Sequence, residues 1–105
     1  MEKGKKYDAG KIRWSLLPWK EVEQIVEILT FGAQKYGDYN WQKSMADQKN
    51  RYFSALMRHL TAWFNGERCD KETGKSHLSH AGCCLLFMMW LDNKDRKQEQ
   101  KEKVV

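Results

Sequence analysis

Residues 76–91 read SHLSHAGCCLLFMMWL, a stretch that becomes wholly apolar after two histidines three positions apart. Ser76 can cap a helix through its side-chain oxygen. From Ala81 to Leu91 no polar side chain interrupts the run, so a helix here presents apolar groups on every side. The stretch therefore predicts a helix that is covered by other helices or by another subunit.

Two more helices are predicted upstream of this stretch. Pro18 suits a first helical turn, and apolar residues recur at helical spacing until Gly37, which can end a helix of about residues 18–36. A second helix is predicted from about Asp47 to the Asn65-Gly66 pair. No stretch alternates apolar and polar residues, so the expected fold class is all-α, a helical bundle of three main helices.

The chain of 105 residues has the length of a single domain. We assign residues 1–92 to one helical domain, with residues 1–17 as an N-terminal aromatic arm, and residues 93–105 to a charged C-terminal tail that is expected to fray. Five Trp, four Tyr and four Phe are many for so small a core. We therefore expect the arm to pack on the bundle or on a neighbour, and a homo-oligomer to complete the bundle.

Charge and hydropathy restrict the partners. A net charge of +5 favours anionic ligands such as nucleotides. A DNA-binding module is disfavoured, because the basic residues are spread over the arm, loops and tail without helix-turn-helix spacing. The polar start MEKGKKYDAGK, the short apolar runs and the three cysteines, two of them adjacent, favour a soluble cytoplasmic protein with no membrane partner.

The loop GAQKYGDYNWQK, residues 32–43, is a candidate nucleotide site. It places a cation, a carboxylate, an amide and flat rings around a glycine turn, which are the groups that hold a base and its phosphates. The alternative is a polar connection between helices in which Trp41 plugs the core. The candidate nucleotide-binding residues are Lys35, Tyr36, Asp38, Asn40 and Trp41, with Arg51, Arg58 and Ser76 from the helices that follow.

All three histidines are expected to face helix contacts. His59 shares a helix side with Tyr52, and His77 and His80 lie one turn apart on the next helix. We interpret His59, His77 and His80 as candidate catalytic residues for proton transfer, at the mouth of a pocket where the helix N–H groups also suit phosphate. The alternative is that the rings only bridge the two helices as buried, hydrogen-bonded side chains.

The loop between these helices carries Glu67, Asp70 and Glu72, which are the candidate metal ligands. Mg²⁺ prefers carboxylates together with substrate phosphate oxygens, so Mg²⁺ is the expected cofactor. A structural zinc is disfavoured, because His77, His80 and Cys84 supply at most three ligands where such sites use four. The alternative is that the acidic loop is only solvated.

Four segments together resemble a known family: KYDAGKIRWSLLPW, LTFGAQKYGDYNW, RYFSALMRHLTAWFNGE and DKETGKSHLSHAGCCLLF. They are similar to the phage-associated dATP/dGTP diphosphohydrolase N-terminal domain over about residues 6–90. The resemblance implies cleavage of purine deoxynucleoside triphosphates into monophosphate and pyrophosphate. It also implies a distant link to the MazG-like all-α pyrophosphohydrolases.

The sequence departs from the MazG-like pattern of helical Glu-x-x-Glu and Glu-x-x-Asp motifs. Glu23 and Glu27 lie off the apolar stripe of the first helix, and the third helix has no carboxylate before Asp92. Two functions therefore stay open. One is a Mg²⁺-dependent hydrolase that uses the acidic loop and the histidines. The other is a non-catalytic nucleotide-binding protein, a sponge for nucleotide signals in phage counter-defence, acting in the host cytoplasm if it is phage-encoded.

Overall fold

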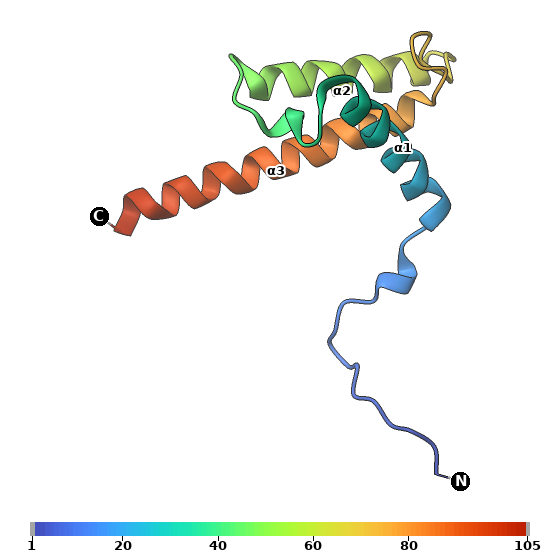
Figure 1. The fold of residues 1–105 in the computed structure, drawn as a ribbon, viewed down its shortest axis with the longest axis vertical. Helices are drawn as coiled ribbons and strands as arrows, with labels where there is room; N and C mark the ends of the chain where they lie inside the picture. Colours follow the sequence, from blue (N-terminus) through green and yellow to red (C-terminus); the bar gives the residue numbers. More distant parts are fainter. Residues whose placement is uncertain (1, 105) are drawn as a thin grey trace.

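The computed structural model describes residues 2–104, and over these residues the chain is all-α with three packed main helices and no strand (Figure 1). The predicted fold class is confirmed. Two short 3-10 turns, η1 and η2, precede the first and second helices. The elements are η1 (Trp14–Leu16), α1 (Trp19–Tyr36), η2 (Asn40–Gln42), α2 (Gln48–Phe64) and α3 (His77–Val104).

The helix ends follow the local chemistry that predicted them. Gly37 ends α1 with a φ of 93°, and its N–H donates to the Ala33 carbonyl at 2.7 Å. Gly66 follows α2 with a φ of 99°. At the start of α3, the Ser76 Oγ accepts a hydrogen bond from the Leu78 N–H at 3.1 Å. The three boundaries were therefore predicted correctly.

The far end of α3 differs from the prediction. The helix continues to Val104, so the residues that were expected to fray form further helical turns. Lys, Glu, Gln and Arg dominate this part of the chain, and these are good helix formers even without an apolar stripe. Arg96 and Asp92 also form an ion pair one turn apart, at 3.4 Å. Apolar periodicity cannot detect such a fully solvated segment.

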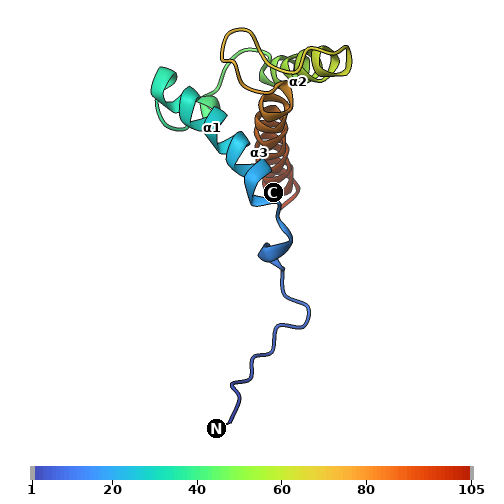
Figure 2. The same cartoon turned by 90° about the vertical axis from the view of Figure 1, so that its right-hand side faces the viewer.

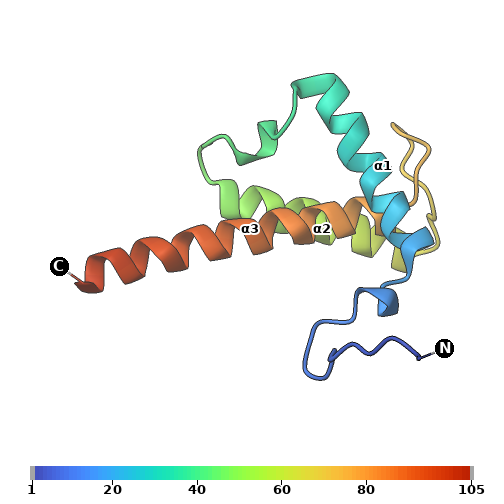
Figure 3. The same cartoon turned by 60° about the horizontal axis from the view of Figure 1, so that its bottom comes forward.

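Helices α2 and α3 lie side by side and antiparallel, and the second half of α3 extends beyond α2 (Figures 1 and 3). The connection before α2 is anchored on them by Trp41, whose ring stacks on Phe87 at 4.5 Å and meets Trp90 edge-on at 5.3 Å. Gln48 donates to the Tyr52 hydroxyl at 3.0 Å and to the Trp41 carbonyl at 3.1 Å. These contacts fix the connection between α1 and α2 on the helix pair.

Helix α1 crosses α3 at a close contact (Figure 3). A Cβ atom built on Gly82 would lie only 2.6 Å from Ile25 Cδ1, so the crossing depends on the absence of a side chain there. The neighbouring Cys83 thiol donates to the Ile25 carbonyl at 3.3 Å. Gly82 thus lets the two helices approach at the point where the first half of α1 meets α3.

The buried core is small for the number of apolar residues. Leu85 and Met89 on α3 are 51% and 55% exposed, so the helices of one chain do not cover α3 on every side. Cover by another subunit, the other predicted possibility, stays a prediction. The radius of gyration is 18.3 Å, against about 13 Å for a compact domain of this length. The core residues are Ile28, Tyr52, Ala81, Cys83 and Cys84. Within residues 2–104 no helix combines the length and the hydropathy needed to cross a bilayer.

The N-terminal arm extends away from the three helices (Figures 1 and 2). Its apolar side chains are exposed; Trp14, for example, is 68% exposed. The arm therefore does not pack on the three helices of its own chain. Packing on a neighbouring chain stays a prediction.

We expect the protein to form a homo-oligomer, because burial of the exposed apolar residues of α3 and of the arm is favourable. Light scattering at micromolar concentration should give a mass that is a multiple of the 12.5 kDa chain. A monomer mass would contradict this. Removal of the arm residues before Pro18 should reduce the association if the arm reaches a neighbour.

Replacement Gly82→Ala should lower the free energy of unfolding by about 1–3 kcal/mol, because the new methyl group overpacks the crossing with Ile25. Gly32→Ala is the matched control, since a Cβ atom at Gly32, also in a helix, meets nothing within 4 Å. The control should be neutral or stabilising by roughly 0.5–1 kcal/mol. Urea unfolding measures both changes, and equal effects would show that the crossing is not tight.

Candidate functional site

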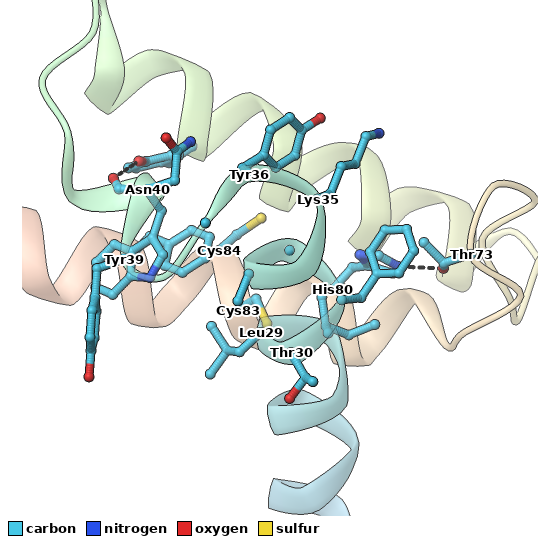
Figure 4. A pocket seen from close by; sticks show the side chains of 18 of the residues that line it. Leu29, Thr30, Lys35, Tyr36, Tyr39, Asn40, Thr73, His80, Cys83 and Cys84 are labelled. Atoms are coloured by element: carbon cyan, nitrogen blue, oxygen red, sulfur yellow. Dashed lines mark hydrogen bonds between the residues drawn. The ribbon is translucent and has the colours of Figure 1, made fainter.

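A pocket of about 950 Å³ lies between α1, the connection after it, and the adjoining faces of α2 and α3 (Figure 4). Its size is within the range of small-molecule sites. Many of the candidate residues line it although they come from four separate parts of the chain. The predicted residues in its wall are Lys35, Tyr36, Asp38, Asn40, Trp41, Arg51, His59, Asp70, Glu72 and His80.

The other candidates lie elsewhere. Arg58 lines a second, smaller hollow of about 340 Å³ on α2. Ser76 serves as the cap of α3. His77 and Glu67 are not part of the pocket wall, and they face each other, with His77 Nε2 3.6 Å from Glu67 Oε2. The structure thus separates the predicted residues into a pocket set and a set behind or beside it.

Two ion pairs join α1 to the 65–76 loop. Lys35 Nζ lies 3.3 Å from Glu72 Oε1, and Lys75 Nζ lies 3.2 Å from Glu27 Oε2. Hydrogen bonding to Tyr36, and then to Glu72, raises the pKa of Lys35 above its usual value, so the ammonium group stays charged. Because the Lys35 pair is exposed, it stabilises the fold little and leaves the cation accessible to an anionic ligand.

The aromatic rings of the pocket divide into a buried and an exposed group. Trp41 is half-buried in its contacts with Phe87 and Trp90. Tyr36 and Tyr39 are 60% and 68% exposed at the pocket (Figure 4). Tyr39 was missed by the sequence analysis, although it stands in the same glycine turn. The exposed tyrosines are therefore the rings available for stacking on a ligand.

The three histidines form one cluster between α2 and α3. The His59 and His80 rings are stacked, with centroids 4.6 Å apart, and His59 Nδ1 lies 2.9 Å from His77 Nδ1. His80 Nε2 lies 2.7 Å from the Thr73 hydroxyl, which ties the cluster to the loop (Figure 4). The expectation that all three rings face the helix contact is met.

The environment keeps these groups in reactive protonation states. Burial lowers the pKa of His59, and the neighbouring His80 and His77 lower it further. Burial also lowers the pKa of His80. Burial by itself would raise the pKa of Asp70, but hydrogen bonds from the Thr73 and Glu72 N–H groups and the field of His80 outweigh it, so this pKa is lowered. The lowered pKa values favour neutral His59 and His80 rings and an ionised Asp70 carboxylate at neutral pH.

The loop that carries Asp70 is held by its own hydrogen bonds. Asp70 Oδ2 accepts from the N–H groups of Glu72 and Thr73 at 3.0 and 3.1 Å. The Asp70 N–H donates to the Lys75 carbonyl at 2.8 Å, and a single antiparallel bridge joins Cys69 to Ser76. Asp70 Oδ1 takes part in none of these bonds. The loop thus positions one carboxylate oxygen for another contact.

A group that can hold a metal ion is present. One ligand atom each from His59, His77 and Asp70 lie within 4.8 Å of one another. Asp70 is the one residue of the predicted metal set in this group. Glu72 is paired with Lys35 instead.

Several pocket residues were not among the candidates, although helical spacing pointed to some of them. Tyr52 shares the side of His59, as predicted, and Cys84 and Phe87 lie one and two turns after His80 on the same side of α3. Cys83 and Thr73 had no such relation to a candidate. The Thr73 hydroxyl lies close to His80 Nε2 because the loop turns back towards α3, and helical spacing does not predict such a contact.

Comparisons with known proteins identify a family. The family described as dATP/dGTP diphosphohydrolase, N-terminal, matches residues 1–102. A protein of Salmonella phage PMBT28 named dATP/dGTP diphosphohydrolase is 37% identical over 90 residues, which are 86% of this chain. The match spans 30% of the length of that phage protein. No solved structure matches.

Thiol reactivity should distinguish the three cysteines. Burial, and then the neighbouring Cys84, raise the pKa of Cys83 to about 12, and burial also raises the pKa of Cys84. Cys69 is exposed. Titration with a thiol reagent at pH 8 should therefore modify one cysteine rapidly in the native protein and all three in denaturant. The Cys69→Ser variant should show no rapid phase; a rapid phase that persists would contradict the burial of the pair.

Proposed function

The chain belongs to the dATP/dGTP diphosphohydrolase N-terminal domain family, and from this premise and the geometry of the pocket we propose that it binds purine deoxynucleoside triphosphates. The observation that carries the proposal is that one pocket is lined by exposed tyrosines, by accessible cations and by two of the clustered histidines, His59 and His80. The choice of purine rests on the family description. The ligand would enter a cavity of about 950 Å³.

The pocket offers separate groups for the base and the phosphates. Tyr36 and Tyr39 are exposed at the pocket and would stack on the base. Trp41 also lines the pocket, and its stacking on Phe87 would fix this part of the wall. Lys35 and Arg51 would contact phosphate oxygens. Asp38 and Asn40 would hydrogen-bond polar edges of the base or the sugar. Arg58 and Ser76 would contribute only if the ligand extended beyond the pocket.

The pocket residues fit Mg²⁺ when it is carried by a triphosphate. Asp70 and Glu72 line the pocket, and two carboxylates with phosphate oxygens are a set that Mg²⁺ accepts. Glu67, the third predicted ligand, lies next to His77 and outside the pocket wall, so it would not contact the phosphates. Bound Mg²⁺ would neutralise charge on the phosphates and on the departing pyrophosphate.

Hydrolysis would add the oxygen of a water molecule to the α-phosphorus and break the bond from the α-phosphorus to the oxygen that bridges to the β-phosphate. The electron pair of that bond leaves with pyrophosphate, and the deoxynucleoside monophosphate remains. The proton of the attacking water would pass to His59 or His80, because both line the pocket and lowered pKa values keep them neutral. His77 would orient His59 through the ring contact at 2.9 Å.

A non-catalytic nucleotide sponge is the second candidate, and one observation favours it. The helices bring no carboxylate into the pocket wall among the described residues; Glu27, for example, pairs with Lys75. Binding would then use the same rings and cations, with the acidic loop as a structural element. Under either function, we propose a homo-oligomer that acts in the host cytoplasm if the protein is phage-encoded.

One experiment separates these functions. The protein is incubated with Mg²⁺ and a panel of deoxynucleoside triphosphates and cyclic dinucleotides, and the nucleotides are separated by chromatography. Monophosphate with pyrophosphate would support the hydrolase. Intact nucleotide recovered from the denatured complex would support the sponge. Neither product nor bound ligand would overturn the proposal of a nucleotide site.

The Lys35→Ala variant should bind the preferred nucleotide about 10- to 100-fold more weakly, because a hydrogen bond to a charged group contributes about 1.5–3 kcal/mol. Lys49→Ala is the matched control, since Lys49 is an exposed lysine on α2 that is not part of the pocket wall. Calorimetric titration measures both affinities. Equal affinities of the two variants would remove Lys35 from the site, and unchanged melting temperatures would exclude a folding effect.

A further inference from the structure

We propose that His59, His77 and Asp70 form a resident site for a divalent transition-metal ion, with Zn²⁺ as the representative ion. Its binding does not require a nucleotide. Because the ion would use the free Asp70 oxygen, Mg²⁺ that accompanies a nucleotide would then be held by Glu72 and the phosphate oxygens. Two imidazole nitrogens and one carboxylate oxygen are a donor set of Zn²⁺ and related ions, whereas Mg²⁺ prefers oxygen ligands.

The two imidazoles already face each other through the same kind of atom. His59 Nδ1 and His77 Nδ1 are 2.9 Å apart, so without an ion one of them must carry the proton shared between them. With an ion, both lone pairs would point at the metal. Two nitrogens at 2.0–2.1 Å from a tetrahedral zinc are roughly 3.3 Å apart. The rings would therefore have to separate by only a few tenths of an ångström.

An independent observation is the unpartnered nitrogen on the far side of His77. His77 is 5% exposed, and its Nε2 is buried without a hydrogen-bond partner. The nearest carboxylate oxygen, Glu67 Oε2, is 3.6 Å away, just too far for a hydrogen bond. A metal on Nδ1 requires the proton on Nε2, where it faces Glu67. Metal-bound histidines commonly donate their second N–H to a carboxylate in this way.

Asp70 and the surrounding loop complete the site. Asp70 Oδ2 is occupied by backbone N–H groups, which orient the carboxylate and leave Oδ1 for the ion. His80 supports the site from outside, because its ring stacks on His59 and its Nε2 is bonded to Thr73. Of the zinc ligands considered from the sequence, His77, His80 and Cys84, only His77 belongs to this group.

Three protein ligands leave at least one coordination position for water or for a phosphate oxygen. His59 and Asp70 both line the pocket, so the free position can face it. This last step rests on the proposed nucleotide function, in which His80 is the imidazole that remains to accept a proton when His59 binds the ion. The metal site itself does not, because its residues and geometry are independent of a bound nucleotide.

The test uses the full chain after removal of metal with a chelator, and titrates Zn²⁺ in the absence of nucleotide by calorimetry. We expect saturable binding of one ion per chain and a rise in melting temperature with Zn²⁺ concentration. Mg²⁺ at the same concentrations should give neither effect. Absence of saturable Zn²⁺ binding would overturn the proposal. Nucleotide binding by the same sample is measured separately, so failure of one function does not conceal the other.

Variants show whether these residues hold the ion. The His77→Ala and Asp70→Asn variants should lose the saturable binding, and Glu67→Gln should weaken it about 10- to 100-fold. Glu23→Gln is the control, because Glu23 is an exposed carboxylate on α1 outside the cluster. Asp70 and Glu67 lie in the surface loop, so these variants keep the test valid if His77→Ala fails to fold. Zn²⁺ binding equal to that of the control in both loop variants would overturn the assignment.

Discussion

Helices α1 and α2 and the connection between them are placed by contacts on the first half of α3. Phe87 receives the stacked ring of Trp41, which fixes the connection between α1 and α2. Gly82 permits the close approach of α1 at Ile25. His77 and His80, in the first turn of α3, contact His59 of α2. About three successive turns of α3, from His77 to Phe87, thus carry a polar cluster, a helix crossing and an aromatic contact.

The pocket is a consequence of this arrangement. Helix α2 runs alongside α3 while α1 crosses it, so α1 and α2 diverge from α3 (Figure 3). The pocket lies between them. The floor consists of side chains of α3, including Cys84 and Phe87. The rim carries Lys35 from the end of α1, and the 65–76 loop closes the side with Asp70. One end of the pocket is therefore aromatic and the other is rich in titratable groups.

The parts of the structure that could be predicted from the sequence are those that depend on neighbouring residues. Gly37, Gly66 and Ser76 end or begin helices through local backbone chemistry, and the prediction of these boundaries was confirmed. The inward direction of His59 and His80 followed from helical spacing, because residues one or two turns apart share a side. Their exact contacts depend on how α2 and α3 pack.

The remaining features could not be read from local patterns. The contact of Thr73 with His80 depends on a loop conformation held by Asp70, and Glu67 meets His77 rather than the phosphate side of the pocket. The helical end of α3 has no apolar periodicity that could reveal it. The arm was expected on the bundle or on a neighbour because of its rings. Apolar composition shows only that a partner surface is favourable, not which chain supplies it.

The histidine cluster relates stability to function in a specific way. A buried ring nitrogen without a partner destabilises the folded state by about 1–3 kcal/mol, and His77 Nε2 is such a group. A cation that binds only the folded cluster would offset this cost, since ligand binding to the native state stabilises it by mass action. The small core of the single chain makes such a contribution substantial. Selection for the folded state and selection for a ligand-binding site would then act on the same three side chains, those of His59, His77 and Asp70.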